Sequence, residues 1–182
     1  MDGHYVLESE NPAVAPITGV REMQIVAQLE RPLHQAAINP LNQHLGQDFK
    51  RKQIMALHGD EHERTNWQVG HVSLPGQAIL MVTLDKAAMP GVPYVDHFED
   101  PETMVWSSQT STSPEGKRGR EILNALETGT QIHLWVRKRK SDVSFTYCGL
   151  AVPTSHEGSK PMAVTFRLLT ALDAATGRRL GP

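Results

Sequence analysis

The chain has few of the residue types that support covalent or membrane chemistry. Its 182 residues include one cysteine, Cys148, so neither an intramolecular disulfide nor a site with two thiolate ligands can form within it. Because Cys148 lies in an apolar run, we expect a small buried packing residue. The longest apolar run, residues 77–84, is too short to span a bilayer, and the acidic N-terminus has no signal-peptide pattern. We therefore expect a cytoplasmic protein without a membrane partner.

Motifs for catalysis and for metal or nucleotide binding are also missing from the sequence. There is no Gly-rich Walker loop and no Asp-x(n)-Glu-x-Lys nuclease pattern. His58 and His62 are four residues apart, but Gly59 and Asp60 separate them and no His-Glu-x-x-His motif results. We therefore expect no catalytic residue, no metal and no cofactor. A histidine-dependent nuclease is the enzymatic alternative, and it would require metal-dependent cleavage by the purified chain.

Charge is distributed unevenly along the chain. Residues 103–182 contain 11 Lys and Arg against 6 Asp and Glu, a net charge of +5. Residues 1–102 contain 7 against 14, a net charge of −7. The overall charge of −2 therefore conceals a basic C-terminal half, which favours an anionic partner there.

Apolar periodicity predicts a helical beginning and a strand-rich remainder. The segments with helical spacing are residues 18–30, residues 33–45 with a break at Pro40, residues 48–58 with Asp48 as the cap, and residues 119–127. The segments with strand spacing are residues 67–74, 77–84, 104–109, 131–138, 144–152 and 162–169. Residues 153–161 are bounded by prolines, and we expect them to form a loop.

This order of elements predicts an α+β fold: a curved, mostly antiparallel β-sheet or half-barrel with flanking helices and a helical N-terminal extension. We expect an arm and helical extension over residues 1–45, the main domain over residues 46–172, and a flexible tail or linker over residues 173–182. Along one predicted strand, His133 and Trp135 alternate with core positions, so we expect that face to meet solvent or a partner.

Several motifs of the main domain resemble a known family. They are YVDHFEDPETMVWSSQTSTSPEGKRGREIL, the strand IHLWVRKRK, the segment FTYCGLAVPTSHEGSKPM and the strand VTFRLL. Over residues 46–170 the chain resembles a domain-of-unknown-function family that is usually appended to superfamily II helicases. That family also forms the C-terminal recognition domain of a type IV restriction enzyme, which joins a phospholipase-D-like nuclease to a helicase.

The resemblance implies a non-enzymatic module, residues 46–172, that recognises modified duplex DNA for a modification-dependent restriction system. The expected mark is 5-methylcytosine. A nuclease would then lie beyond Pro182 or on a separate nuclease or helicase subunit. The alternative mark is a phosphorothioate in the DNA backbone, and the alternative function is that of a protein-interaction module in a helicase–nuclease complex.

Strand residues with aromatic or hydrogen-bonding side chains are candidates for contact with a modified base. Trp106 lies beside Ser107 and Gln109, so a stacking plane and hydrogen-bonding groups share one segment. Core packing is the competing interpretation for any tryptophan. The resemblance adds the loop pair after Ser155. The predicted base-binding residues are Trp106, Ser107, Gln109, Tyr147, His156 and Glu157.

Basic residues occur in four clusters, at residues 50–52, 117–120, 137–140 and 178–179. Each cluster can contact phosphates, and each on its own can equally be a solvated surface. Three of them belong to the net-positive half, and two of these flank the strand that carries Trp135. The predicted phosphate-binding residues are Lys117, Arg118, Arg120, Arg137 and Lys138.

Overall fold

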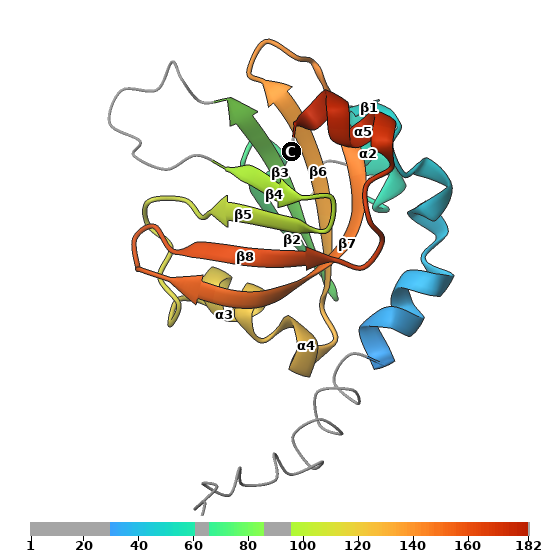
Figure 1. The fold of residues 1–182 in the computed structure, drawn as a ribbon. Helices are drawn as coiled ribbons and strands as arrows, with labels where there is room; N and C mark the ends of the chain where they lie inside the picture. The colour runs from blue at the N-terminus through green and yellow to red at the C-terminus, as the bar shows by residue number, and fades with distance from the viewer. Residues whose placement is uncertain (1–29, 61–65, 86–95, 182) are drawn as a thin grey trace, which may run out of the picture.

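One eight-stranded sheet organises the part of the chain that the computed structural model describes, residues 30–60, 66–85 and 96–181 (Figure 1). The strands are β1 Asp48–Lys50, β2 His71–Leu74, β3 Gln77–Asp85, β4 His97–Asp100, β5 Thr103–Ser107, β6 Gln131–Arg139, β7 Ser144–Glu157 and β8 Ala163–Leu168. Their order is β2-β3-β6-β7-β8-β5-β4, and β1 pairs with β7. Only the pair β3–β6 is parallel within this sheet, so the predicted α+β fold with a mostly antiparallel sheet is confirmed.

Short helices flank the sheet. Residues 30–38 are helical, and the helices after them are η1 Pro40–His44, α2 Arg51–Leu57, α3 Lys117–Leu123, α4 Ala125–Thr128 and α5 Ala174–Leu180. None of the helices in the described ranges is long and apolar enough to cross a bilayer. The helix expected over residues 18–30 lies almost wholly outside the described residues.

Strand β7 connects the two halves of the sheet. Ala151 pairs with both neighbouring strands, since the residues before it pair with β6 and those after it with β8. Cys148 is the extra residue of a bulge opposite Leu134 and Trp135. The next residue, Gly149, has a φ of +96°, a conformation that a side chain would strain. The bulge and the glycine together increase the local twist and bend the sheet along β7.

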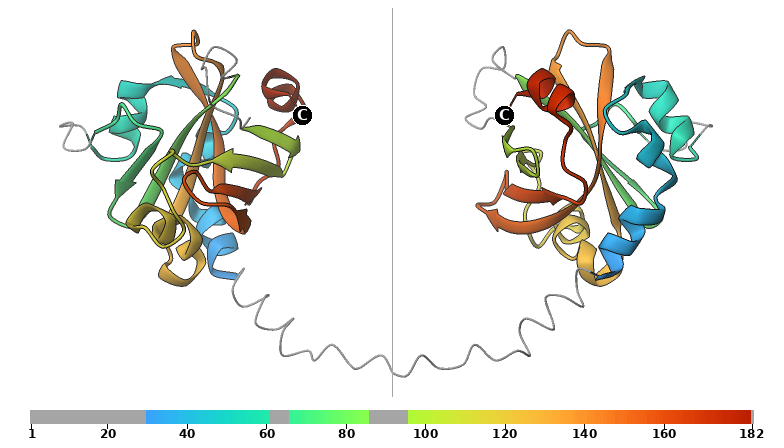
Figure 2. Two further views of the ribbon diagram at one scale, coloured as in Figure 1. Left: turned by 90° about the vertical axis from the view of Figure 1, so that its left-hand side faces the viewer. Right: turned by 45° about the vertical axis from the view of Figure 1, so that its right-hand side comes forward.

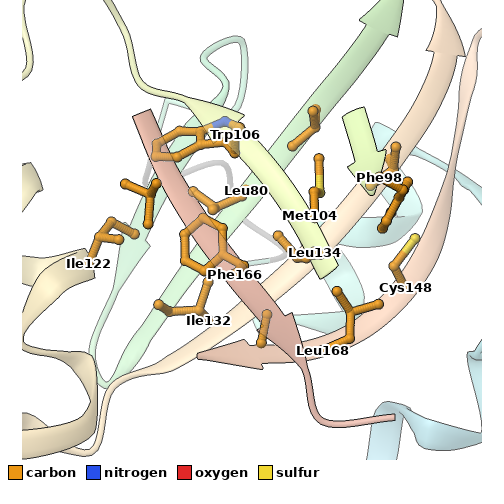
Figure 3. Packing of buried hydrophobic residues seen from close by; sticks show 14 of the residues in the cluster. Leu80, Phe98, Met104, Trp106, Ile122, Ile132, Leu134, Cys148, Phe166 and Leu168 are labelled. Carbon is orange, nitrogen blue, oxygen red and sulfur yellow. The ribbon is translucent and has the colours of Figure 1, made fainter. Parts of the chain in front are cut away.

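The bend encloses the larger hydrophobic core. Figure 2 shows β5 and β8 turned toward β3 and β6, with α3 and α4 at one end of the concave side and α5 at the other. Side chains of both halves meet there, among them Leu80, Trp106, Leu134 and Phe166 (Figure 3). Cys148 is buried in the same cluster, as predicted, and burial raises the pKa of its thiol. The concave side of the sheet is therefore filled with side chains.

A second core lies on the convex face, where η1 and α2 cover β3, β6 and β7. Its buried members are Leu41, Ile54, Met55, Trp67, Val72, Ile79, Met81, Trp135, Phe145 and Tyr147. The expectation that His133 and Trp135 face solvent or a partner is wrong, because the N-terminal helices cover that face of β6. Their exposed fractions are 2% and 0%. Both faces of the central strands are thus buried, which the alternating pattern alone did not indicate.

Polar groups inside the second core hydrogen-bond to one another. Asn39 Nδ2 donates to Tyr147 Oη at 2.9 Å, and the same hydroxyl lies 2.9 Å from His133 Nδ1. Trp135 Nε1 donates to His58 Nε2 at 3.0 Å. Because Asn39 is the N-cap of η1, these bonds fix the residues before position 46 onto the sheet. Residues 39–45 therefore pack as part of the main domain.

Two local expectations are corrected by strand pairing. Asp48 does not cap a helix; it begins β1, which pairs with β7, and α2 starts at Arg51. The loop expected over residues 153–161 is largely strand, because β7 continues to Glu157 alongside β8. Pro153 is tolerated there beside a bulge on a strand edge, where its missing N–H interrupts no ladder.

The C-terminal segment is also more ordered than expected. Residues 173–182 were expected to form a flexible tail or linker, but Ala174–Leu180 forms α5. The Asp173 side chain caps this helix by accepting hydrogen bonds from Ala175 N and Thr176 N. Leu180 is buried in the larger core, so this helix closes one end of the concave side.

Candidate functional site

Two loops meet at the edge of the sheet where β5 ends and β8 begins (Figure 1). Ser108 N donates to the Met162 carbonyl at 2.9 Å, and Met162 N donates back to Ser108 Oγ at 3.0 Å. Lys160 N donates to the Thr112 carbonyl at 3.0 Å. These bonds hold the turn between β7 and β8 against the loop that leads into α3. We call residues 107–120 and 156–161 together the edge surface.

The loop after β5 folds tightly over the first turn of α3. A Cβ atom on Gly119 would lie 2.0 Å from the Ser113 carbonyl oxygen and 2.9 Å from Pro114 Cα. No other residue type fits there without displacing the loop, which explains the glycine of the Lys-Arg-Gly motif. The position of α3 beneath the edge surface therefore depends on this glycine.

The edge surface joins residues that the sequence predicted for two different roles. Arg118 Nη1 donates to Gln109 Oε1, so a predicted phosphate contact and a predicted base contact form one unit. Lys117 and Arg120 are exposed on the same helix, and Lys160 is exposed on the adjoining turn. The guanidinium and ammonium groups are therefore available to an anionic ligand at this edge.

Strand register places Trp106 and His156 on one row. Trp106 pairs with Val164, which pairs with His156 on its other side. Directly paired residues of antiparallel strands point to the same face of a sheet. The side chains of Trp106 and His156 therefore both project toward the concave side. Their Cα atoms are about 10 Å apart, because one strand lies between them. Ser107 and Glu157 occupy the next row and point to the opposite face. The predicted base-binding residues thus divide between two faces.

Two of the predicted aromatic contacts are core residues. Trp106 is 5% exposed and packs with Ile122 of α3, Phe166 and the ring of His71 (Figure 3). Tyr147 has no exposed surface and lies on the other side of the sheet, in the second core. Tyr147 therefore does not share a surface with Trp106. Trp106 lies directly behind the edge surface.

The predicted phosphate contacts also fall into two groups. Lys117, Arg118 and Arg120 belong to the edge surface, whereas Arg137 and Lys138 lie near the far end of β6. Arg137 is half-buried on the convex face and donates from Nε to Thr83 Oγ1 at 2.9 Å. Lys138 is exposed and points to the other face of β6, as alternation along a strand requires.

Asp96 is not among the predicted site residues, but it contacts the first residue of the edge surface. Its side chain is 1% exposed, and its Oδ1 accepts a hydrogen bond from Ser107 N at 2.8 Å. A buried carboxylate next to Trp106 accepts hydrogen bonds strongly, because its surroundings are apolar. In the sequence, Asp96 is distinguished only by its position in the segment of residues 96–98, which is part of the motif that resembles the family.

An ion pair between β2 and α3 fixes the helix that carries the edge-surface cations. His71 Nε2 lies 3.0 Å from Glu121 Oε2, and Ser73 Oγ donates to the same oxygen at 2.5 Å. Burial alone would raise the pKa of Glu121, but hydrogen bonds from His71 and Ser73 and the charges of His71 and Lys117 outweigh it and lower the pKa. The ionised carboxylate therefore holds α3 against the sheet.

The histidines that could have suggested a metal site have other partners. His58 Nε2 accepts from Trp135 Nε1, and its Nδ1 lies 2.7 Å from Gln77 Oε1. His62 lies outside the described residues. Over residues 30–60, 66–85 and 96–181, no three His, Cys, Asp or Glu side chains gather as metal ligands would.

The family model described as a domain of unknown function, DUF3427, matches residues 44–176. The chain belongs to the DUF3427 family. The matched range contains all eight strands and the whole edge surface. Of η1 it contains only the last residue, so residues 30–43 lie outside the matched range.

Solved structures with a similar arrangement have low sequence identity to this DUF3427 domain, and no curated protein matches the chain. A SUVH5 SRA complex with hemi-methylated CG DNA has a TM-score of 0.49 and 13% identity, covering 71% of this chain and 91% of that one. Arabidopsis thaliana SUVH6 in complex with SAM has a TM-score of 0.46 and 10% identity, covering 71% and 26%. The DNA recognition domain of the cytosine modification-dependent restriction endonuclease LpnPI has a TM-score of 0.42 and 10% identity, covering 68% and 70%.

Proposed function

We propose that this DUF3427 domain is a DNA-binding module that recognises modified duplex DNA through the edge surface. The observation that carries the proposal is the coupling of two loops, through Ser108 with Met162 and Lys160 with Thr112. It places the Gln109–Arg118 unit and His156 at one edge of the sheet. The same pieces of sequence carry the resemblance to the recognition domain of a type IV restriction enzyme.

Each part of the edge surface has a proposed role. Lys117, Arg118 and Arg120 contact phosphates, which gives affinity that falls steeply with salt. Gln109 and His156 supply hydrogen bonds to a base edge. Trp106 is 5% exposed and packs directly behind the edge surface, so its proposed role is to support the loop that carries Gln109.

The proposed mark is 5-methylcytosine, and the module serves a modification-dependent restriction system whose nuclease is another domain or subunit. A phosphorothioate is the alternative mark, because a sulfur-substituted phosphate also combines an anion with a less polar atom. Comparing methylated, sulfur-modified and unmodified duplexes of one sequence tests the proposal. The module itself is proposed to be non-enzymatic, so purified chain with magnesium, manganese or zinc should leave each duplex uncut.

An Arg118→Gln variant is expected to bind modified duplex about 10- to 100-fold more weakly than the wild-type chain. The change removes a cation and the partner of Gln109, and a charged hydrogen bond contributes about 1.5–3 kcal/mol. Fluorescence anisotropy with a labelled duplex measures the loss. Arg167→Gln is the matched control, since Arg167 is an exposed arginine paired with Glu102 away from the edge surface. Equal affinities of the two variants would remove the edge surface from the interface.

A further inference from the structure

We propose a second site, on the convex face, that binds the phosphate backbone of duplex DNA without regard to base or modification. We call it the convex cationic patch. It consists of Arg51, Lys52, Arg137, Arg139 and Lys140. It goes beyond the proposed recognition of a modified site, because it requires neither the edge surface nor a mark on the DNA.

Two arginines flank one aromatic ring at the centre of the patch. The guanidinium carbon of Arg137 lies 4.6 Å from the ring centroid of Phe145, and that of Arg51 lies 5.2 Å from the same centroid. Arg137 Nη1 also donates to the Asp142 carbonyl at 2.9 Å, and Arg51 Nη1 donates to the Trp67 carbonyl. These neutral acceptors orient the two side chains without neutralising them.

Holding two guanidinium groups together is electrostatically unfavourable. Burial is the larger of two causes that lower the pKa of Arg51, and the charge of Arg137 is the other. Among the described residues, no carboxylate oxygen lies within salt-bridge distance of either guanidinium. A bound anion would relieve this repulsion, and guanidinium groups suit phosphate because their N–H donors match its oxygens.

The remaining cations lie close to this arginine pair along the chain. Lys52 follows Arg51 and is exposed on the first turn of α2. Arg139 is two residues beyond Arg137 on the same face of β6, and Lys140 is exposed in the turn that follows.

Acidic residues offset only part of this charge. Asp85 pairs with Arg139 across β3 and β6, and Asp142 Oδ2 accepts from Arg139 N. Five cations against these two carboxylates give this group of residues a net charge of +3. The chain as a whole has a net charge of −2, so the patch concentrates positive charge on a molecule that would otherwise repel DNA.

The patch and the edge surface lie at different places on the sheet. Phe145 and Arg137 belong to the convex face beneath α2, whereas the edge surface lies where β5 ends and β8 begins. Figure 2 shows the turn between β6 and β7 at the other end of the sheet from α3. In this proposal the patch contacts a segment of DNA separate from the one at the edge surface.

Charge reversal at Lys52 and Lys140 tests the patch in the full chain. Both side chains are exposed, so Lys52→Glu and Lys140→Glu leave the packing intact. Binding of an unmodified 20-base-pair duplex is measured by anisotropy between about 50 and 200 mM salt. The double variant should bind on the order of 100-fold more weakly at about 50 mM salt, and its slope of log affinity against log salt should be smaller by about two. Arg167→Glu, which reverses one exposed charge on β8, should change neither quantity to this extent.

A second measurement separates this inference from the proposed function. The preference of the double variant for modified over unmodified duplex should equal that of the wild-type chain, because the edge surface is unchanged. Wild-type chain with excess duplex should form a complex with two duplexes in sedimentation velocity, and the double variant should form a complex with one. A double variant that behaves like Arg167→Glu overturns the inference and leaves the edge surface untouched. The inference is also overturned if the double variant loses binding to poly-glutamate but keeps its binding to DNA. The partner of the patch would then be an acidic protein.

Discussion

A Gly119→Ala variant is expected to lose about 1–3 kcal/mol of unfolding free energy and most of its affinity for modified duplex. The added Cβ would lie 2.0 Å from the Ser113 carbonyl oxygen, and backbone on both sides has to move to admit it. The loop that carries Gln109 and the helix that carries Arg118 are those two pieces of backbone. Urea unfolding measures the stability, and anisotropy with a labelled duplex measures the binding.

The chain provides a matched control for this variant. Gly177 is also a helical glycine, in α5, but a Cβ there would meet nothing within 4 Å. Gly177→Ala should therefore keep or slightly raise stability, because alanine favours a helix by up to about 1 kcal/mol over glycine. If the Gly119→Ala variant has the same unfolding free energy and the same DNA affinity as the Gly177→Ala variant, the described packing of the loop on α3 is contradicted.

The protein is expected to lose stability as the pH falls below about 6.5, by up to about 2.7 kcal/mol per pH unit. Burial lowers the pKa of His133 well below its ordinary value, and the charge of His58 lowers it further. Burial also lowers the pKa of His58, although its hydrogen bond with Gln77 opposes the effect. Both rings therefore take up protons at a lower pH in the folded chain than in the unfolded chain, where they do so below about 6.5. The unfolded state then binds more protons, so acid favours unfolding.

Urea unfolding at a series of pH values between about 7.5 and 5 checks this dependence. The matched control is Gly177→Ala, which changes no titratable group and should leave the slope against pH unchanged. His133→Gln should reduce the slope by about half over the upper part of the range, whatever its effect on stability at neutral pH. A wild-type stability that stays constant from about 7.5 to 5 would show that the two rings do not titrate as their burial requires.

Most of the architecture could be predicted from the pattern of apolar residues. Alternation in residues 77–84, 131–138 and 162–169 corresponds to β3, β6 and β8, each within one residue at either end. Turn residues marked the breaks between them. The α+β class follows because local periodicity and the sheet agree along these segments.

The errors occur where tertiary contacts decide the local structure. Asp48 has the side chain of a helix cap, but pairing of β1 with β7 takes that residue into the sheet. His133 and Trp135 alternate with core residues as a solvated face would, and only the N-terminal helices bury them. Neither contact has a signal in the neighbouring sequence, because Thr146 is 98 residues from Asp48 and His58 is 77 residues from Trp135 along the chain.

The candidate site was predicted in part. The Lys-Arg-Gly motif and Gln109 meet at the edge surface, because the loop and α3 are adjacent in sequence and their contact is local. Tyr147 and Arg137 were grouped with them on residue type alone, and the sheet places both on its other face. Asp96 was not selected because a single carboxylate in the sequence does not reveal its burial.

The affinity ratio between methylated and unmodified duplexes tests the central claim most directly. Wild-type chain is titrated at about 150 mM salt against duplexes of one sequence that carry 5-methylcytosine, a phosphorothioate or no modification. The account predicts at least tenfold tighter binding to one modified duplex, and loss of that preference in Arg118→Gln but not in Lys52→Glu with Lys140→Glu. Equal binding of all three duplexes by the wild-type chain would contradict the account.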